Sequence, residues 1–241
     1  MIYTIATQKG GTGKTTTAAA LAQAAAYTGK KALAIDLDPQ GNLSFALAAD
    51  ATAPGSYELL NGSPVEEVIQ TTPQGVDVIT ASPNLQTEKS SQGSARRLQE
   101  ALEPIRRKYS VIVIDTPATA GELQYNALQA ADRLLIPLQA DTYNAQSLYQ
   151  IAAVAEQIKQ SNPRLKIAGA ILTQYDTRTT LSRQLRDILE ATAKVLKIPF
   201  LGTVRQAIAV QEAAALQRSL FDYAPKSNPA IDYMQIFNTL K

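Results

Sequence analysis

Short apolar runs rich in β-branched residues recur along the 241-residue chain and alternate with longer stretches of helical composition. Several runs are apolar almost throughout, which is typical of strands covered on both faces of a parallel sheet. Such a sheet requires right-handed helical crossovers between successive strands. The predicted strands are 3–7, 32–36, 76–81, 111–115, 133–138, 167–173 and 200–204.

Six helices are predicted between these runs, over 14–28, 95–108, 122–131, 144–160, 179–195 and 206–218. The stretch 50–75 is rich in Gly, Pro, Ser and Thr, and we expect one or two short surface helices there. We find no repeat or linker, and therefore predict one α/β domain over 1–241, with about seven to eight mostly parallel strands and helices on both faces. Because the chain opens on a strand, no N-terminal helix-turn-helix domain is expected.

The chain contains no cysteine and no histidine. Disulfides, iron–sulfur clusters and cysteine nucleophiles are therefore excluded, as is a Ser-His-Asp triad, and a zinc site is disfavoured. Any chemistry has to use carboxylates, lysine, hydroxyls, backbone amides and a bound magnesium ion. No apolar run approaches the ~20 residues of a membrane span, and no leader pattern opens the chain, so we expect a cytoplasmic protein.

The glycine-rich stretch TQKGGTGKTTT, residues 7–17, lies between the first predicted strand and the first predicted helix. This context is the one in which a phosphate-binding loop is credible. Glycines leave backbone N–H groups open to phosphate oxygens, and the N-terminus of the helix faces the same anion. We predict that Lys14 contacts the β- and γ-phosphates and that the Thr15 hydroxyl binds Mg²⁺. The other nucleotide contacts are predicted from Gly10, Gly11, Thr12, Gly13 and Thr16.

Three aspartates follow predicted strands: Asp36 and Asp38 in DLDPQGN, and Asp115 at the end of VIVID. Carboxylates at i and i+2 leave a strand on the same side, after which Pro39 and Gly41 turn the chain. ATP hydrolysis needs one group that orients the attacking water and others that support the metal. The three aspartates meet that need, although aspartates at strand ends also cap turns and helices.

The spacing KGGTGKT, residues 9–15, resembles the deviant Walker A motif of the ParA/MinD family of P-loop ATPases. DLDPQGN is similar to the second motif of that family, and VIVIDTPA resembles its Walker B strand, with Ala118 where the family commonly has a second proline. LLIPLQADTYNAQSL (134–148) and ILTQYDTRT (171–179) extend the resemblance over most of the chain.

This resemblance implies a role for each site residue. Lys9 is expected to cross a dimer interface to the nucleotide of the partner, and a solvated loop lysine is the alternative. Lys9, Lys14 and Asp38 form the implied catalytic set, in which Asp38 positions or activates the attacking water. The implied metal shell is Thr15, Asp36 and Asp115. The implied neighbours of the adenine are Gln174 and the backbone around Thr203–Arg205.

Within the family, the chain resembles the DNA-partition branch of the short ParA/Soj type, on YDTRT and on residues 210–233. Cysteine-dependent relatives are excluded. A MinD-type membrane helix is disfavoured, because the last helical pattern, 228–241, has Lys241 as its only basic residue. Its apolar face (Ile231, Met234, Phe237 and Leu240) is expected to pack against the domain.

The branch implies non-specific DNA binding by the ATP-bound homodimer. Residues 1–149 hold 11 Lys/Arg against 14 Asp/Glu, whereas residues 150–241 hold 12 against 7, which suits a polyanion partner of the C-terminal part. The candidate DNA contacts are Arg205, Arg218 and Lys226, with Arg183 and Arg186 as further options. A surface salt bridge is an equal alternative for each arginine.

The implied function is a Mg²⁺-dependent ATPase that dimerises around two ATP molecules and associates with the nucleoid. It would segregate plasmid or chromosomal DNA with a ParB-like centromere-binding partner. The first alternative is a MinD-like or protein-cargo-positioning ATPase acting on membrane or protein assemblies. The second is a metabolic P-loop enzyme with a small-molecule substrate.

Overall fold

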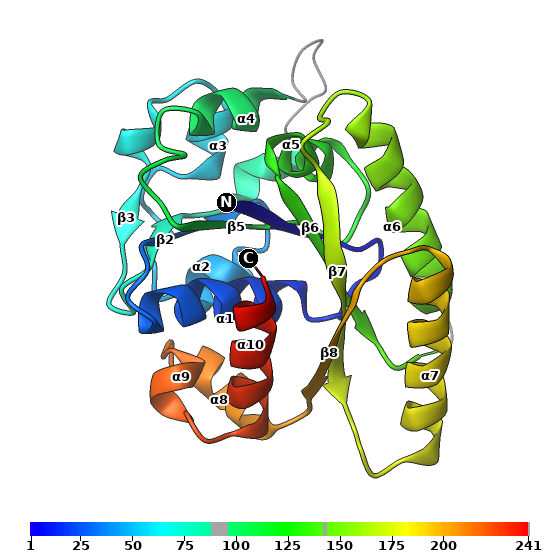
Figure 1. Cartoon of the computed structure of the whole chain (residues 1–241). Coiled ribbons are helices and arrows are strands. Elements are labelled where there is room, and N and C mark those ends of the chain that lie inside the picture. The colour runs from blue at the N-terminus through cyan, green and yellow to red at the C-terminus, as the bar shows by residue number, and fades with distance from the viewer. Residues whose placement is uncertain (88–95, 142–143, 241) are drawn as a thin grey trace.

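The computed structural model describes residues 1–87, 96–141 and 144–240. An eight-stranded sheet in the order β3-β4-β2-β5-β1-β6-β7-β8 runs through the molecule (Figure 1). Neighbouring strands are parallel except β3, which pairs antiparallel with β4 at one edge. The strands are β1 Ile2–Ile5, β2 Ala32–Asp36, β3 Gln70–Thr71, β4 Asp77–Ile79, β5 Val111–Asp115, β6 Arg133–Gln139, β7 Lys166–Tyr175 and β8 Phe200–Arg205.

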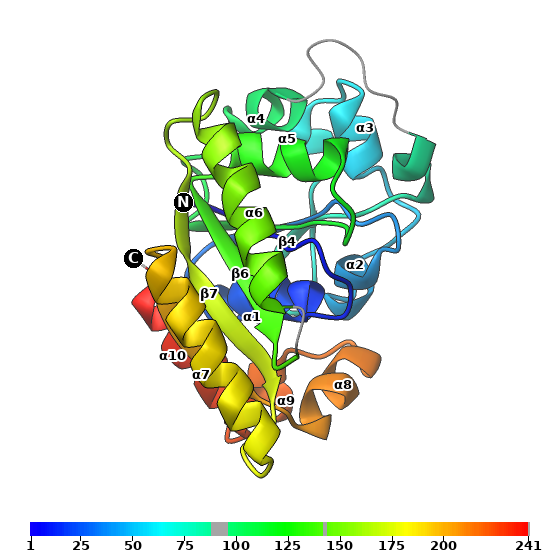
Figure 2. The same ribbon diagram turned by 90° about the vertical axis from the view of Figure 1, so that its right-hand side faces the viewer.

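Helices cover both faces of the sheet, which confirms the predicted fold class (Figures 1 and 2). One face carries α1 Lys14–Tyr27, α2 Asn42–Ala46, α8 Ile208–Ala215, α9 Leu220–Tyr223 and α10 Asn228–Thr239. The other carries α3 Ser56–Leu60, α4 Arg97–Leu102, α5 Glu122–Ala130, α6 Asn144–Lys159 and α7 Thr180–Val195. Two 3₁₀ turns, η1 Val65–Glu67 and η2 Pro83–Thr87, complete the elements.

The predicted elements are found with shifted ends, and some short ones were missed. The predicted helix 95–108 is reduced to α4, because Pro104 cannot continue a helix. Residue 95 of this predicted helix lies outside the described residues, and so do residues 142–143 of the stretch 134–148. The loose stretch 50–75 contains α3, η1 and the missed strand β3. Helix α2 was also missed, because a segment of this length shows no periodicity.

Alternate residues of the central strands enter two different cores. In β2, Ala32 and Ala34 face α1, whereas Leu33 and Ile35 pack with α3, α4 and α5. Alanines also dominate the buried face of α1 over 18–25. Small residues on both sides let the helix lie close to the sheet. This packing fixes the position of the loop that joins β1 to α1.

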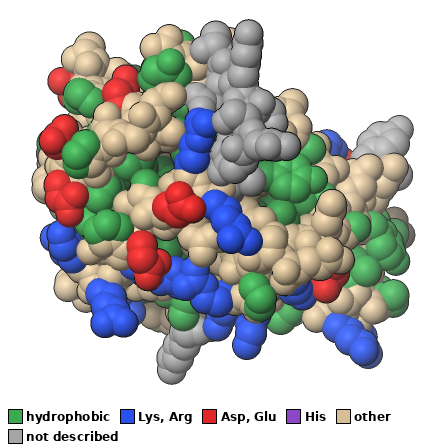
Figure 3. Space-filling view, turned by 90° about the horizontal axis from the view of Figure 1, so that it is seen from above, with side chains coloured by type: hydrophobic (Ala, Val, Ile, Leu, Met, Phe, Trp, Pro, Cys, Tyr) green, Lys and Arg blue, Asp and Glu red, His purple; other side chains and the backbone are tan. Residues whose placement is uncertain are grey.

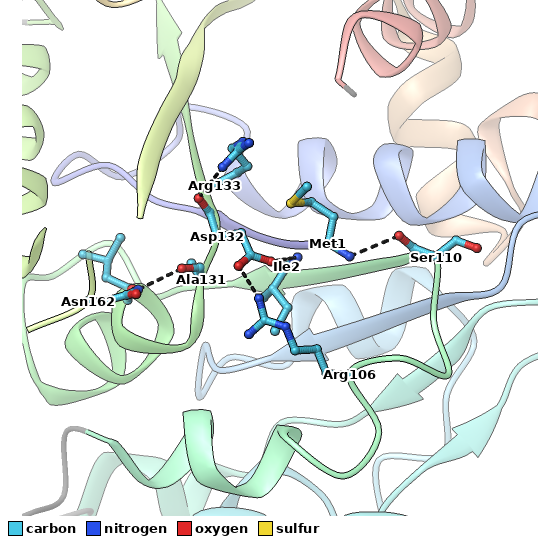
Figure 4. Close-up of polar contacts among 9 residues, drawn as sticks. Met1, Ile2, Arg106, Ser110, Ala131, Asp132, Arg133 and Asn162 are labelled. Carbon is cyan, nitrogen blue, oxygen red and sulfur yellow. Dashed lines mark hydrogen bonds and ion pairs between the residues drawn. The ribbon is translucent and has the colours of Figure 1, made fainter. Parts of the chain in front are cut away.

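A polar cluster lies at the N-terminal ends of β1 and β6, on the opposite side of the sheet from the loop at their C-terminal ends (Figure 4). The carboxylate of Asp132 accepts a hydrogen bond from the Ile2 backbone N–H at 2.9 Å and pairs with the guanidinium of Arg106. Asn162 donates to the carbonyl of Ala131 at 2.8 Å. Asp132 is 7% exposed. The cluster therefore holds the starts of β1 and β6 through a nearly buried charge.

Replacing Arg106 with alanine is expected to lower the free energy of unfolding by about 3 kcal/mol, because it leaves the buried Asp132 carboxylate without its cation. Urea denaturation followed by circular dichroism measures the change. Arg107→Ala, at an exposed neighbouring position, is the control and should change stability by less than about 0.5 kcal/mol. If the two variants have the same free energy of unfolding, the Arg106–Asp132 ion pair does not contribute to stability.

Candidate functional site

The glycine-rich loop joins β1 to α1 at the C-terminal edge of the sheet. Gly11 and Gly13 have φ angles of 74° and 80°, a region that side chains with a Cβ rarely adopt. A Cβ on Gly13 would also lie 3.4 Å from the Thr173 hydroxyl oxygen. The loop is thus a glycine-shaped cradle in front of the first N–H groups of a 14-residue helix, which is the arrangement that binds phosphate.

The two lysines of the loop occupy different places. Lys14 is 7% exposed, and its ammonium donates to the carbonyl of Lys9 at 3.3 Å, so its side chain folds back over the loop. Burial lowers the pKa of Lys14. The Lys9 side chain lies at the rim and forms an ion pair with Asp141, which follows β6. Lys14 is therefore a buried cation against the loop, whereas Lys9 is half-buried, with 27% of its side chain exposed, and is held by Asp141.

Two acids lie below the loop as partners in the register of β2 and β5. Asp36 and Asp115 are both fully buried. Burial raises the pKa of Asp36 to about 6. Burial and the charge of Asp36 raise the pKa of Asp115 well above its usual range. The Thr15 hydroxyl donates to the Asp115 carboxylate at 2.7 Å. The strand ends thus concentrate negative charge next to Lys14.

The donor set fits a magnesium ion that is shared with a nucleotide. Over 1–87, 96–141 and 144–240, no three His, Cys, Asp or Glu side chains are grouped to hold a metal by themselves. Thr15 and Asp115 offer adjoining hard oxygen donors, the kind that Mg²⁺ takes together with phosphate oxygens. A cation there would also offset the cost of burying two carboxylates, which their raised pKa values express.

Asp36 makes contacts that the sequence did not reveal. Its carboxylate accepts hydrogen bonds from the backbone N–H and the hydroxyl of Ser44, both at 2.8 Å, and from the backbone N–H of Asp38 at 3.1 Å. Asp36 therefore anchors the segment that runs from β2 into α2. A contact between Asp36 and the metal shell stays a prediction.

Asp38 stands on this anchored segment, half-buried, beside the loop. Its carboxylate accepts from the Gln40 backbone N–H at 3.1 Å, and Gly41, with φ 67°, turns the chain into α2. Its negative charge raises the pKa of Lys14, against the larger effect of burial. Asp38 is thus a carboxylate near the phosphate lysine with one oxygen tied to its own turn, a position suited to orienting a water.

The predicted neighbours of the adenine come together beside the loop. A cavity of about 140 Å³ is lined by Gly13, Gln174, Arg205 and Tyr233, among others. Gln174 donates to the carbonyl of Gly11 at 2.9 Å. The sequence did not single out Tyr233, whose hydroxyl lies 3.1 Å from that of Thr17 in α1. The aromatic residue is visible in the sequence, but its partner lies 216 residues away.

The candidate DNA contacts differ in their surroundings. The guanidinium of Arg205 is held by Asp232 through bonds of 2.9 and 2.6 Å. Arg218, three residues after the end of α8, is exposed, and its guanidinium carbon lies 5.5 Å from the centre of the Tyr223 ring. Lys226 is exposed between α9 and α10. The structure thus leaves two of the three exposed on the α8–α10 segment.

The further options lie elsewhere. Arg183 and Arg186 are on α7, on the opposite face of the sheet, and Arg186 pairs with Glu190 at 3.5 Å. The face over α3 and α4, seen in Figure 3, carries acidic and basic side chains, with the basic ones gathered mainly toward the lower part of the view. The exposed Arg218 and Lys226 make the α8–α10 segment the candidate polyanion surface.

The apolar face of α10 packs largely against the domain. Tyr233, Ile236 and Phe237 are buried, and Met234 and Leu240 lie against the same core, whereas Ile231 is 41% exposed. The structure also bears on the membrane alternative. In the part of the chain that it describes, no helix combines the length and the apolar character needed to span a bilayer.

The family model described as "AAA domain" matches residues 1–167. The chromosome partitioning protein ParA of Myxococcus xanthus is 35% identical to this chain, over 98% of the chain and 86% of the relative. The chromosome-partitioning ATPase Soj of Thermus thermophilus is 34% identical over 96% and 92%. A solved structure of cobyrinic acid a,c-diamide synthase from Mycobacterium smegmatis, with bound ATP analogue and magnesium, matches with a TM-score of 0.83 and 30% identity over 98% and 92%.

Proposed function

Because the chain belongs to the AAA-domain family and, within it, to the ParA/Soj ATPases, we propose that it is a Mg²⁺-dependent ATPase that uses ATP to pair with a second copy of itself. The arrangement of the two lysines carries this proposal. Lys14 is buried inside the loop, whereas Lys9 lies at its rim in an ion pair with Asp141. Because Lys14 already serves the nucleotide of its own loop, the second lysine, held by Asp141, is assigned to the nucleotide of the partner.

In the proposed mechanism the loop N–H groups and Lys14 bind the phosphates and stabilise the charge that develops on them. Thr15 and Asp115 would hold the magnesium ion, which supplies further neutralisation of that charge. Asp38 orients the attacking water. Asp36 holds in place the segment from Asp38 to the start of α2, called the Asp38 segment below. Lys9 of one subunit leaves Asp141 and reaches the nucleotide of the other. Pairing then depends on ATP in both subunits.

We propose further that the ATP-bound dimer binds DNA without sequence preference, becomes associated with the nucleoid and segregates DNA with a ParB-like partner. The names of the relatives and the exposed cations of the α8–α10 segment support this part. An activating partner suits a site that rests on positioning, since the chain offers no histidine or cysteine for proton transfer.

Arg218→Ala is expected to weaken binding of random duplex DNA to the ATP form and to lower the slope of log K against log salt by about 1 per subunit, because one phosphate contact is lost. Fluorescence anisotropy over a salt series measures both. Arg164→Ala, at an exposed position before β7, is the matched control and should leave the slope unchanged. Equal slopes for both variants would remove Arg218 from the DNA surface.

The same assay separates the proposal from its rival. The ATP form is offered random duplex DNA and anionic liposomes, each at low and high salt. Binding to DNA that weakens with salt supports the partition function. Binding to liposomes alone would overturn it in favour of an ATPase that positions membrane or protein assemblies. No binding to DNA at low salt would also contradict it.

A further inference from the structure

Gln74 stands at the tip of a tight turn between β3 and β4. The turn has Pro73 before Gln74 and Gly75, with φ 73°, after it. It is closed by hydrogen bonds from Thr72 N to Val76 O and from Gly75 N to Thr72 O, both 3.0 Å. Proline and a left-handed glycine make the backbone stiff. The half-buried Gln74 side chain is therefore presented from a fixed base.

The amide of Gln74 joins three segments that are distant in the sequence. Its oxygen accepts from the Gln23 side chain of α1 at 2.8 Å. Its nitrogen donates to the carbonyl of Ala46 at 2.8 Å and to the carbonyl of Gln217 at 2.9 Å. A glutamine amide has two donors and one acceptor oxygen, so both donors are used here. Ala46 is the last residue of α2, and Gln217 lies just after α8.

Two more hydrogen bonds close the network around this amide. The Gln217 side chain donates to the carbonyl of Phe45 at 3.1 Å, and the Gln23 oxygen accepts from the Leu220 backbone N–H at 3.2 Å. Gln217 also has φ 52°, in the left-handed region that residues other than glycine rarely adopt. The network therefore holds the chain after α8 in a conformation that it would not adopt alone.

The proposed function requires that the nucleotide site affects the DNA-binding surface, and the two ends of this network lie next to these two sites. One end is α2, which continues the segment that begins at Asp38 and is anchored by Asp36 through Ser44. The other end is Gln217, the residue directly before the exposed Arg218. A rearrangement of the segment from Asp38 to α2 around a γ-phosphate would reach the carbonyl of Ala46, and Gln74 bonds both to that carbonyl and to the carbonyl of the residue before Arg218.

We propose that Gln74 is a positioning residue that couples the nucleotide state of the Asp38 segment to the α8–α9 surface that carries Arg218. This inference rests on the proposed function only in that DNA is taken as the ligand of the surface. The coupling between nucleotide state and that surface does not depend on DNA. The alternative is a structural peg that only adds stability. The two differ because a peg changes the free energy of unfolding and leaves the response to nucleotide unchanged.

The first arm of the test measures DNA affinity in ATP and in ADP. Gln74→Met keeps the size of the side chain and removes the amide. It is expected to reduce the ratio of the two affinities by about tenfold, since all three hydrogen bonds of the amide are lost, among them the two that join α2 to the chain after α8, and to leave ATP binding and ATP-dependent dimerisation intact. Gln157→Ala, at an exposed position of α6, is the control with an unchanged ratio.

The second arm needs no DNA. Because the chain has no cysteine, Leu216→Cys, at a site 57% exposed, accepts a single nitroxide or fluorescent label beside Gln217. The labelled parent is expected to give different spectra in ATP and ADP, and Gln74→Met is expected to abolish that difference.

The outcomes separate the two proposals. If the label responds to nucleotide and loses the response in Gln74→Met, the coupling stands even where DNA is not bound, and only the DNA function falls. If the labelled parent gives identical spectra in ATP and ADP, the coupling is overturned. If Gln74→Met lowers the melting temperature but keeps the affinity ratio and the label response, Gln74 is only a structural peg.

Discussion

Asp38→Ala is expected to slow ATP hydrolysis by roughly 100-fold or more, because a positioned carboxylate that orients or activates a water contributes about 10²–10⁴ to such reactions. Nucleotide binding should persist, since the glycine cradle, Lys14 and the Thr15–Asp115 contact are untouched. Phosphate release with and without Mg²⁺ gives the rate, and a fluorescent ATP analogue gives the affinity. The variant is thus expected to be a trapped ATP form.

Two further variants show whether the loss comes from the water or from the fold. Asp38→Asn keeps the acceptor for the Gln40 N–H and removes the charge, so it should hydrolyse as slowly as Asp38→Ala. Asp187→Ala, an exposed acid on α7, should hydrolyse at the parental rate. If Asp38→Asn restores activity, the carboxylate serves only to hold its turn, and its catalytic role is refuted.

Lys9→Ala is expected to weaken ATP-dependent pairing by roughly a hundredfold to ten-thousandfold. A two-fold dimer loses two charge-assisted contacts to phosphate, each of about 1.5–3 kcal/mol. ATP binding by the single chain should change little, because Lys9 lies at the rim and Lys14 is the cation inside the loop. Analytical ultracentrifugation over a protein concentration series in ATP gives the dissociation constant of the dimer.

The ion pair with Asp141 supplies the control for this prediction. If Lys9 acts only through that pair, Asp141→Ala must weaken the dimer as much as Lys9→Ala does. If Lys9 leaves Asp141 to reach the partner, Asp141→Ala removes a competing contact, and pairing should be equal or tighter. Weakening of the same size in both variants would contradict the crossing role.

Local chemistry explains how much of this molecule the sequence predicts. The apolar runs predicted every strand of the described residues except β3, because a strand buried on both faces has to be apolar at nearly every position. The loop from Gly10 to Thr15 was recognisable because phosphate binding requires glycines, a lysine and a hydroxyl at fixed spacing. Asp36 and Asp115 came together because parallel strands end at the same edge of the sheet.

What the sequence did not predict depends on contacts between distant residues. The binding of Arg205 by Asp232 spans 27 residues, and Gln74 meets a carbonyl 143 residues away. No local pattern distinguishes these side chains from solvated ones, since the partner is determined by the packing of α8–α10 on α1. The strand β3 and helix α2 were missed because they are too short to show a period.

The central claim is that this chain uses ATP to pair with itself, and Asp38→Ala allows the most direct test, because it holds ATP without consuming it. Size-exclusion chromatography with light scattering compares its mass in Mg²⁺–ATP and in Mg²⁺–ADP. Twice the chain mass of 25.9 kDa is expected in ATP, and a single chain mass in ADP. A single chain mass in both nucleotides, or a dimer in both, would contradict the central claim.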